Sequence, residues 1–175
     1  MIAPSDSRQL LMFCEEMVKI MSSIVRFGMI AVLMGLLTGQ PGLAGALENG
    51  HFVFDTATGF AADDYDPVAY FVDCTLREGK ADYETIWDEV GWRFVNEGNR
   101  DAFVRNPYVY APAYGGRCPV AMAQGHPAEG DPRLWAIYND RLYFFYSREN
   151  MQAFTEEPAR IVAEAQASWD RLYPY

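Results

Sequence analysis

The segment Phe94–Gly125, FVNEGNRDAFVRNPYVYAPAYGGRCPVAMAQG, carries most of the information about the fold. Its sequence predicts a short strand and then a helix over Asn99–Arg105, for which Asn96 is a suitable N-terminal cap. Pro107 ends this helix, because proline cannot continue the backbone hydrogen bonds and also restricts the residue before it. A tyrosine-rich loop, a pair of glycines and one cysteine follow.

The same pattern occurs a second time, further along the chain. An offset of 51 residues matches Phe94 with Phe145, Ala102 with Ala153, Phe103 with Phe154, and Pro107 with Pro158. Each copy predicts a hairpin, a polar cap, a short helix and a proline, which indicates an internal duplication. The matched positions are few, so chance similarity is the alternative. Neither unit could bury its apolar side alone, and we expect the two units to pack against each other.

Two hairpins are expected after the N-terminal region. Their strands are Tyr83–Trp87 with Trp92–Val95, and Leu134–Tyr138 with Leu142–Tyr146, each pair joined by turn residues. Val68–Phe71 reads as a further buried strand, and Cys118–Ala123 as a short strand or one helical turn. Helices are expected over Arg148–Glu156 and from Pro158 through Leu172. Together these elements predict an α+β fold of small antiparallel hairpins with short helices.

Residues 1–46 read as a secretory signal peptide. The apolar run Phe27–Thr38 is shorter than the roughly 20 residues that span a bilayer, and the small residues Ala44–Ala46 suit cleavage after Ala46. The segment before Met21 carries two adjacent glutamates where a signal peptide carries positive charge, so Met21 is the alternative start. An uncleaved membrane anchor is the other interpretation of this region. Residues 47–64 then form an N-terminal extension, and 65–175 form the folded domain.

The charge of the chain narrows the classes of partner. It has 24 acidic and 14 basic side chains, for a net charge of −10. Nucleic acids and anionic lipids are both bound through basic surfaces, so we expect no nucleic-acid partner. We also expect no stable membrane insertion once the signal peptide is removed. The sequence predicts a periplasmic or secreted protein, with a small ligand or a protein partner that is unknown.

Three motifs in a fixed order resemble a known family. They are YDPVAYF at Tyr65–Phe71, WRFVNEGNRDAFVRNPYVYAPAYGGRC at Trp92–Cys118, and DRLYFFYS at Asp140–Ser147. This set resembles the YHS domain, and most of all the exported bacterial proteins in which a signal peptide precedes one such domain. The resemblance covers roughly 65–169. It implies a small α+β domain, and for much of the family no biochemical activity is established.

Some short YHS domains, attached to metal-transport proteins, are thought to bind metal through cysteines. The resemblance matches those cysteines to Ala69, Val95 and Asn99, none of which supplies a thiolate. Metal binding by that cysteine set is therefore not carried over to this chain. This chain also has Arg117 where the exported relatives usually have an aromatic residue.

Cys118 allows three interpretations. A disulfide with Cys74 fits an oxidising compartment and the even number of cysteines after the signal peptide. A buried, inert thiol is the second interpretation. The third is a reactive or metal-binding thiol, because the neighbouring Arg117 would favour the thiolate. Met122 and His126 could complete a soft donor set with Cys118, which would suit copper or another soft metal.

The tyrosine-rich loop is the other candidate site. The candidate ligand-binding residues are Tyr108, Tyr110, Tyr114, Gly115, Gly116, Arg117 and Cys118. The tyrosines could line an aromatic pocket, or they could simply pack the loop onto the hairpins. No catalytic constellation is recognisable, so the sequence favours a non-enzymatic binding module of unassigned ligand. Soft-metal binding at Cys118 and a thiol-dependent redox protein or enzyme remain the alternatives.

Overall fold

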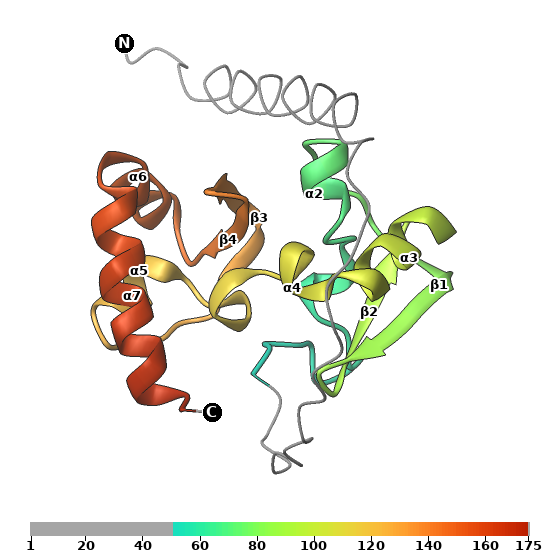
Figure 1. Ribbon diagram of the computed structural model, residues 1–175, viewed down its shortest axis with the longest axis horizontal. Helices are drawn as coiled ribbons and strands as arrows, with labels where there is room; N and C mark the ends of the chain where they lie inside the picture. Colours follow the sequence, from blue (N-terminus) through green and yellow to red (C-terminus); the bar gives the residue numbers. More distant parts are fainter. Residues whose placement is uncertain (1–50, 175) are drawn as a thin grey trace, which may run out of the picture. The chain divides into compact units, whose positions relative to one another are not determined.

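A computed structural model describes residues 51–174 of the chain (Figure 1). The expected signal peptide at 1–46, the alternative start at Met21 and the first residues of the N-terminal extension lie outside the described residues. No helix within 51–174 is long and apolar enough to cross a membrane. The described part contains two small antiparallel sheets and several helices, which confirms the predicted α+β class.

The first unit is a hairpin followed by two helices. Its elements are β1 (Lys80–Trp87), β2 (Val90–Phe94), α3 (Glu97–Arg105) and α4 (Pro107–Tyr110). Asp88 and Glu89 join the strands and both have positive φ, as a two-residue type I′ turn requires. The side chain of Asn96 accepts a hydrogen bond from the N–H of Asn99 at 2.9 Å, which confirms the predicted cap.

The second unit repeats this plan. Its elements are β3 (Asp131–Tyr138), β4 (Arg141–Phe145), α6 (Arg148–Glu156) and α7 (Pro158–Leu172), each starting 51 residues after its counterpart. Asn139 and Asp140 form the turn with positive φ, and Ser147 caps α6 by accepting from the N–H of Asn150. The two units therefore share their turns, caps and element order. That they arose by duplication of one ancestral unit stays a prediction.

The structural repeat includes the segment before each hairpin. Asp66 precedes Pro-Val-Ala and the short helix α2 (Ala69–Val72), while Cys118 precedes Pro-Val-Ala at the start of α5 (Pro119–Ala123). The amide of Asp66 donates to the carbonyl of Arg77 at 2.9 Å, and that of Cys118 donates to Ala128 at the same distance. Asp66 and Cys118 are therefore equivalent positions, although the second connection to the hairpin is one residue shorter.

Two local predictions are wrong. Val68–Phe71 was expected as a strand, but this run lies largely in the helix α2, because Asp66 accepts from the N–H groups of Val68 and Ala69 and so caps a helical turn. A short apolar run cannot by itself distinguish a buried strand from a buried helix. The expected loop Tyr108–Tyr114 contains α4 and the start of a 3₁₀ turn over Ala113–Gly116.

The core consists of three apolar clusters. The first-unit cluster contains Ala61, Val68, Val90, Trp92, Phe94, Phe103 and Ala111. The second-unit cluster is built around Cys118, Met122, Tyr143, Phe145, Phe154, Ile161, Ala165 and Trp169. The inter-unit cluster contains Ala62, Tyr70, Phe71, Leu142 and Phe144. Because α2 and β4 both contribute to the inter-unit cluster, the two units pack against each other as expected.

Candidate functional site

A cavity of about 460 Å³ is lined by residues of both units and of the N-terminal extension. This volume lies within the roughly 300–1,000 Å³ of typical small-molecule sites. Six of the lining side chains are aromatic: Phe52, Trp87, Tyr108, Tyr114, Tyr143 and Trp169. The polar lining consists of His51, Asp88, Asn139, Arg141 and Gln166. A mostly aromatic wall with a few polar groups is the usual composition of a site for a small organic ligand.

The repeat explains how the hairpins contribute to this cavity. Asp88 and Asn139 are equivalent turn residues, and both line the cavity. Along β4 successive side chains point to opposite faces, so Arg141 and Tyr143 share the cavity side. Leu142, on the other face, packs in the inter-unit cluster. The same strand thus joins the two units and forms one wall of the site.

The aromatic side chains of the cavity are held by one another. The rings of Trp87 and Tyr108 meet edge to face at 5.1 Å, and Phe52 lies 5.2 Å from Trp87. On the second unit, the ring of Tyr114 lies 5.9 Å from that of Trp169. Such pairs are worth about 0.5–1.5 kcal/mol beyond the area that they bury. The lining is therefore largely preformed.

Burial keeps the phenols of Tyr114 and Tyr143 protonated. The hydroxyl of Tyr114 donates to the carbonyl of Val162 at 3.1 Å, and burial raises the pKa of Tyr114 far above its usual value. Burial also raises the pKa of Tyr143, with the positive charge of Arg141 acting in the opposite direction. The hydroxyl of Tyr114, whose proton is donated to Val162, can accept a hydrogen bond from a ligand, and that of Tyr143 can donate one. Because both phenols keep their proton, they are poor general bases.

The two charged side chains of the cavity have different surroundings. Asp88 lies 3.9 Å from the Nδ1 atom of His51. Arg141 has no carboxylate within 4.0 Å among the residues that the structure describes. Its guanidinium therefore retains donors that a ligand could use.

The glycine pair brings the N-terminal extension to the cavity. Gly115 has φ of +60°, and a β-carbon there would collide with the carbonyl of His51. The N–H of Val53 donates to the carbonyl of Gly115 at 2.8 Å, and Arg117 donates to the carbonyl of His51. Only glycine permits this close approach. His51 and its neighbour Phe52 are thereby positioned in the cavity wall.

Only some of the seven predicted ligand-binding residues lie in the cavity. Tyr108, Tyr114 and Gly115 line the cavity. Tyr110 instead packs its ring at 5.5 Å from Phe71, and Gly116 faces a second cavity of about 420 Å³. Arg117 lies over the ring of Tyr173 at 4.7 Å, and Cys118 is fully buried in the second-unit cluster. Sequence reasoning missed Trp87, Tyr143 and Trp169, which the alternating and helical apolar patterns had marked only as core.

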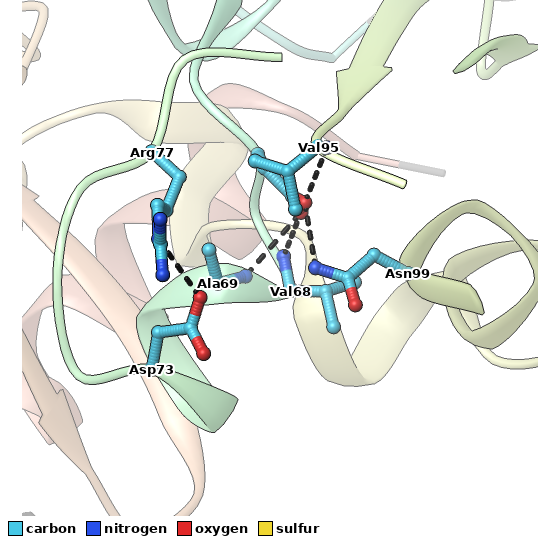
Figure 2. A network of polar contacts seen from close by, with 7 residues as sticks. Val68, Ala69, Asp73, Arg77, Val95 and Asn99 are labelled. Atoms are coloured by element: carbon cyan, nitrogen blue, oxygen red, sulfur yellow. Dashed lines mark hydrogen bonds and ion pairs between the residues drawn. The ribbon is translucent and has the colours of Figure 1, made fainter. Parts of the chain in front are cut away.

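A separate polar site surrounds Asp66, and Figure 2 labels its partners Val68, Val95 and Asn99. Its carboxylate is fully buried and accepts hydrogen bonds from the N–H of Val68 at 2.8 Å, the N–H of Val95 at 2.9 Å and the side-chain amide of Asn99 at 2.7 Å. The N–H of Ala69 donates at 3.3 Å. The three positions that the resemblance matches to metal-binding cysteines, Ala69, Val95 and Asn99, therefore converge on this one carboxylate. Here they form a hydrogen-bonded anchor between α2, β2 and α3.

Cys118 occupies the equivalent place in the second unit. It is a free thiol, completely buried, and the side-chain amide of Asn150 lies 3.3 Å from its sulfur. Asn150 is the counterpart of Asn99. The predicted disulfide between Cys74 and Cys118 is not formed in the structure, because Cys118 is a free thiol. Cys74 lies two residues after the end of α2, in the first unit.

The predicted soft-metal residues differ in exposure. Met122 is fully buried like Cys118, whereas His126 is exposed. The left-handed residue Gly125 ends α5, and the N–H of His126 donates to the carbonyl of Ala121 at 3.1 Å, as in a Schellman motif. Within 51–174 no group of three or more His, Cys, Asp or Glu side chains is arranged to hold a metal ion.

The resemblance to YHS domains rests on the three sequence motifs and on their order along the chain. No protein-family model matches the sequence, and no match was found among curated proteins or among solved structures.

Proposed function

We propose that this protein is a non-enzymatic, exported YHS-like binding module that holds a small, largely apolar ligand in the aromatic cavity between its two hairpin units. The observation that carries the proposal is the lining of that cavity, six aromatic side chains around about 460 Å³. Aromatic walls supply large contact area to flat apolar molecules. The polar groups are few, as is usual where they serve to orient a ligand.

Preformed walls favour binding. The rings of Phe52 and Trp87 pack in a tilted contact 5.2 Å apart, so these two side chains have little freedom left to lose when a ligand binds. The close approach of the extension at Gly115 fixes a further part of the wall. A site that is ordered before binding loses less conformational entropy and binds more tightly.

The position of the thiol favours binding over thiol chemistry. Cys118 is not among the residues that line the cavity, and its side chain is fully buried in the second-unit cluster. A ligand in the cavity therefore does not meet the sulfur. The equivalence of Cys118 with Asp66 supports a structural role for this position in both units.

A fluorescence titration with a neutral apolar dye, N-phenyl-1-naphthylamine, tests the proposal. Saturable fluorescence enhancement is expected, and Tyr108→Ala should weaken binding about three- to tenfold because one aromatic wall is lost. Tyr146→Ala is the matched control, since Tyr146 is exposed to a similar degree, 65% against 69%, but does not line this cavity. Absence of saturable binding, or equal weakening by both variants, would contradict the proposal.

A further inference from the structure

We infer that the cavity is selective for a flat apolar ligand that carries a carboxylate, and that Arg141 binds this carboxylate. The inference rests on the proposed function and gives it a ligand class. The juxtaposition behind it is an arginine on the wall of an aromatic cavity, with no carboxylate of residues 51–174 paired to it.

The position of Arg141 follows from the second hairpin. It is the first residue of β4, directly after the turn Asn139-Asp140, and pairs with Tyr138 across the hairpin. Two residues further on, Tyr143 lies on the same face of the strand and also lines the cavity. The guanidinium is close enough to Tyr114 and Tyr143 to oppose the rise in their pKa values that burial causes. The positive charge of Arg141 therefore acts on side chains of the cavity wall.

Arg141 combines a place in the cavity wall with the lack of a carboxylate partner. Among the described residues Arg105, Arg117, Arg148 and Arg171 also form no ion pair, but none of them lines the cavity. Arg77, Arg93, Arg100, Arg133 and Arg160 each form at least one ion pair with a carboxylate. Arg141 forms none with the described residues, although the chain has an excess of acidic side chains. A guanidinium presents a planar fork of donors that matches a carboxylate in two parallel hydrogen bonds. The aromatic wall beside it suits the apolar part of the same ligand.

The remaining charge of the cavity gives the ligand an orientation. Asp88 lies on the first hairpin, next to His51, and forms no ion pair with Arg141. A ligand carboxylate would be repelled by Asp88 and attracted by Arg141. The acid group is thus directed to the second hairpin, with the ring between the aromatic side chains.

Two isosteric probes separate charge recognition from apolar binding. 1-Naphthylacetate and 1-naphthylacetamide have the same ring and nearly the same size, and differ in charge. Calorimetric titration of the wild-type protein should show about tenfold tighter binding of the acid. The net charge of −10 repels anions in general, so preference for the acid reports a local contact.

Two variants assign the preference to one side chain. Arg141→Gln should remove the preference for 1-naphthylacetate and leave binding of the amide within about twofold of wild type. Arg148→Gln makes the same change of charge at an exposed residue outside the cavity, and should keep the preference. Raising the salt concentration should reduce it in the wild type.

The outcomes distinguish this inference from the proposed function. If the amide binds as tightly as the acid, or if Arg141→Gln keeps the preference, the role of Arg141 is wrong and the aromatic cavity still binds. If neither naphthyl probe binds and the neutral dye does not bind either, the proposed function itself fails.

Discussion

Asp66 and Cys118 occupy equivalent positions in two structural repeats of this chain. Each precedes Pro-Val-Ala and a short helix, and each is contacted by an equivalent asparagine: Asn99 lies 2.7 Å from a carboxylate oxygen, and Asn150 lies 3.3 Å from the sulfur. The first unit has a carboxyl group that accepts several hydrogen bonds, and the second has a thiol. This equivalence indicates that Cys118 has a structural role, as Asp66 has in the first unit.

Replacement of Asp66 should lower the free energy of unfolding. In Asp66→Ala the buried N–H groups of Val68 and Val95 and the amide of Asn99 lose their acceptor, each at about 1–3 kcal/mol. The free energy of unfolding, measured by urea denaturation, should fall by at least about 3 kcal/mol. Asp82→Ala, at an exposed position of β1, should change it by less than about 0.5 kcal/mol. Similar small effects in both variants would show that the carboxylate is no anchor.

Cys118 should be protected from alkylation in the folded protein. Its side chain is fully buried, so iodoacetamide should leave the Cys118 peptide unmodified in native conditions and modify it after denaturation. Mass spectrometry of the digested protein measures this directly. Rapid native alkylation, or a peptide cross-linked between Cys74 and Cys118, would contradict the structure.

Removal of the thiol should not affect the cavity. Cys118→Ala is expected to bind N-phenyl-1-naphthylamine within about twofold of wild type, because Cys118 is absent from the cavity lining. The variant should be less stable than wild type by about 1–2 kcal/mol, since a buried side chain is shortened. If dye binding is lost while circular dichroism shows a folded protein, the result would favour a thiol-dependent redox protein or enzyme instead.

The local elements of the fold could be predicted from the sequence. The turn Asn139-Asp140, the caps Asn96 and Ser147 and the bounds of α6 and α7 depend on neighbouring residues, and the structure agrees with them. In the first hairpin the second strand begins at Val90 and not at the expected Trp92, because Asp88 and Glu89 alone form the turn. Tertiary features could not be predicted in this way. The cavity joins Trp87 to Trp169 across much of the chain, and no local pattern shows that they share a site. The cysteine pairing was wrong for the same reason, because burial of Cys118 depends on packing of the whole second unit.

The two repeats should respond alike to loss of their central phenylalanines. Phe103 in α3 and Phe154 in α6 are equivalent, and their side chains are 0% and 2% exposed. Phe103→Ala and Phe154→Ala should each lower the free energy of unfolding by about 3–5 kcal/mol. If one substitution lowers the free energy of unfolding by less than about 1 kcal/mol in urea denaturation, the two phenylalanines do not have equivalent roles in their cores.

Alkaline pH should destabilise the protein in part through Tyr70. Burial raises the pKa of Tyr70 well above the ordinary value of 10.0, and its hydroxyl donates to the carbonyl of Pro132. The folded protein keeps this phenol protonated while the unfolded chain loses the proton, so stability falls as pH rises above about 10. Tyr70→Phe should make this decline shallower in urea denaturation between about pH 9 and 11. Tyr146→Phe, at an exposed position, should leave it unchanged.

Binding in the aromatic cavity is tested most directly through the indole N–H signals of the four tryptophans. Trp87 and Trp169 line the cavity, whereas Trp135 in β3 packs against Tyr70 and does not line it. Titration of the ¹⁵N-labelled protein with 1-naphthylacetamide should shift the Trp87 and Trp169 signals saturably and with one dissociation constant, while the Trp135 signal stays in place. If none of these signals moves, or if Trp135 moves most, the cavity is not the binding site.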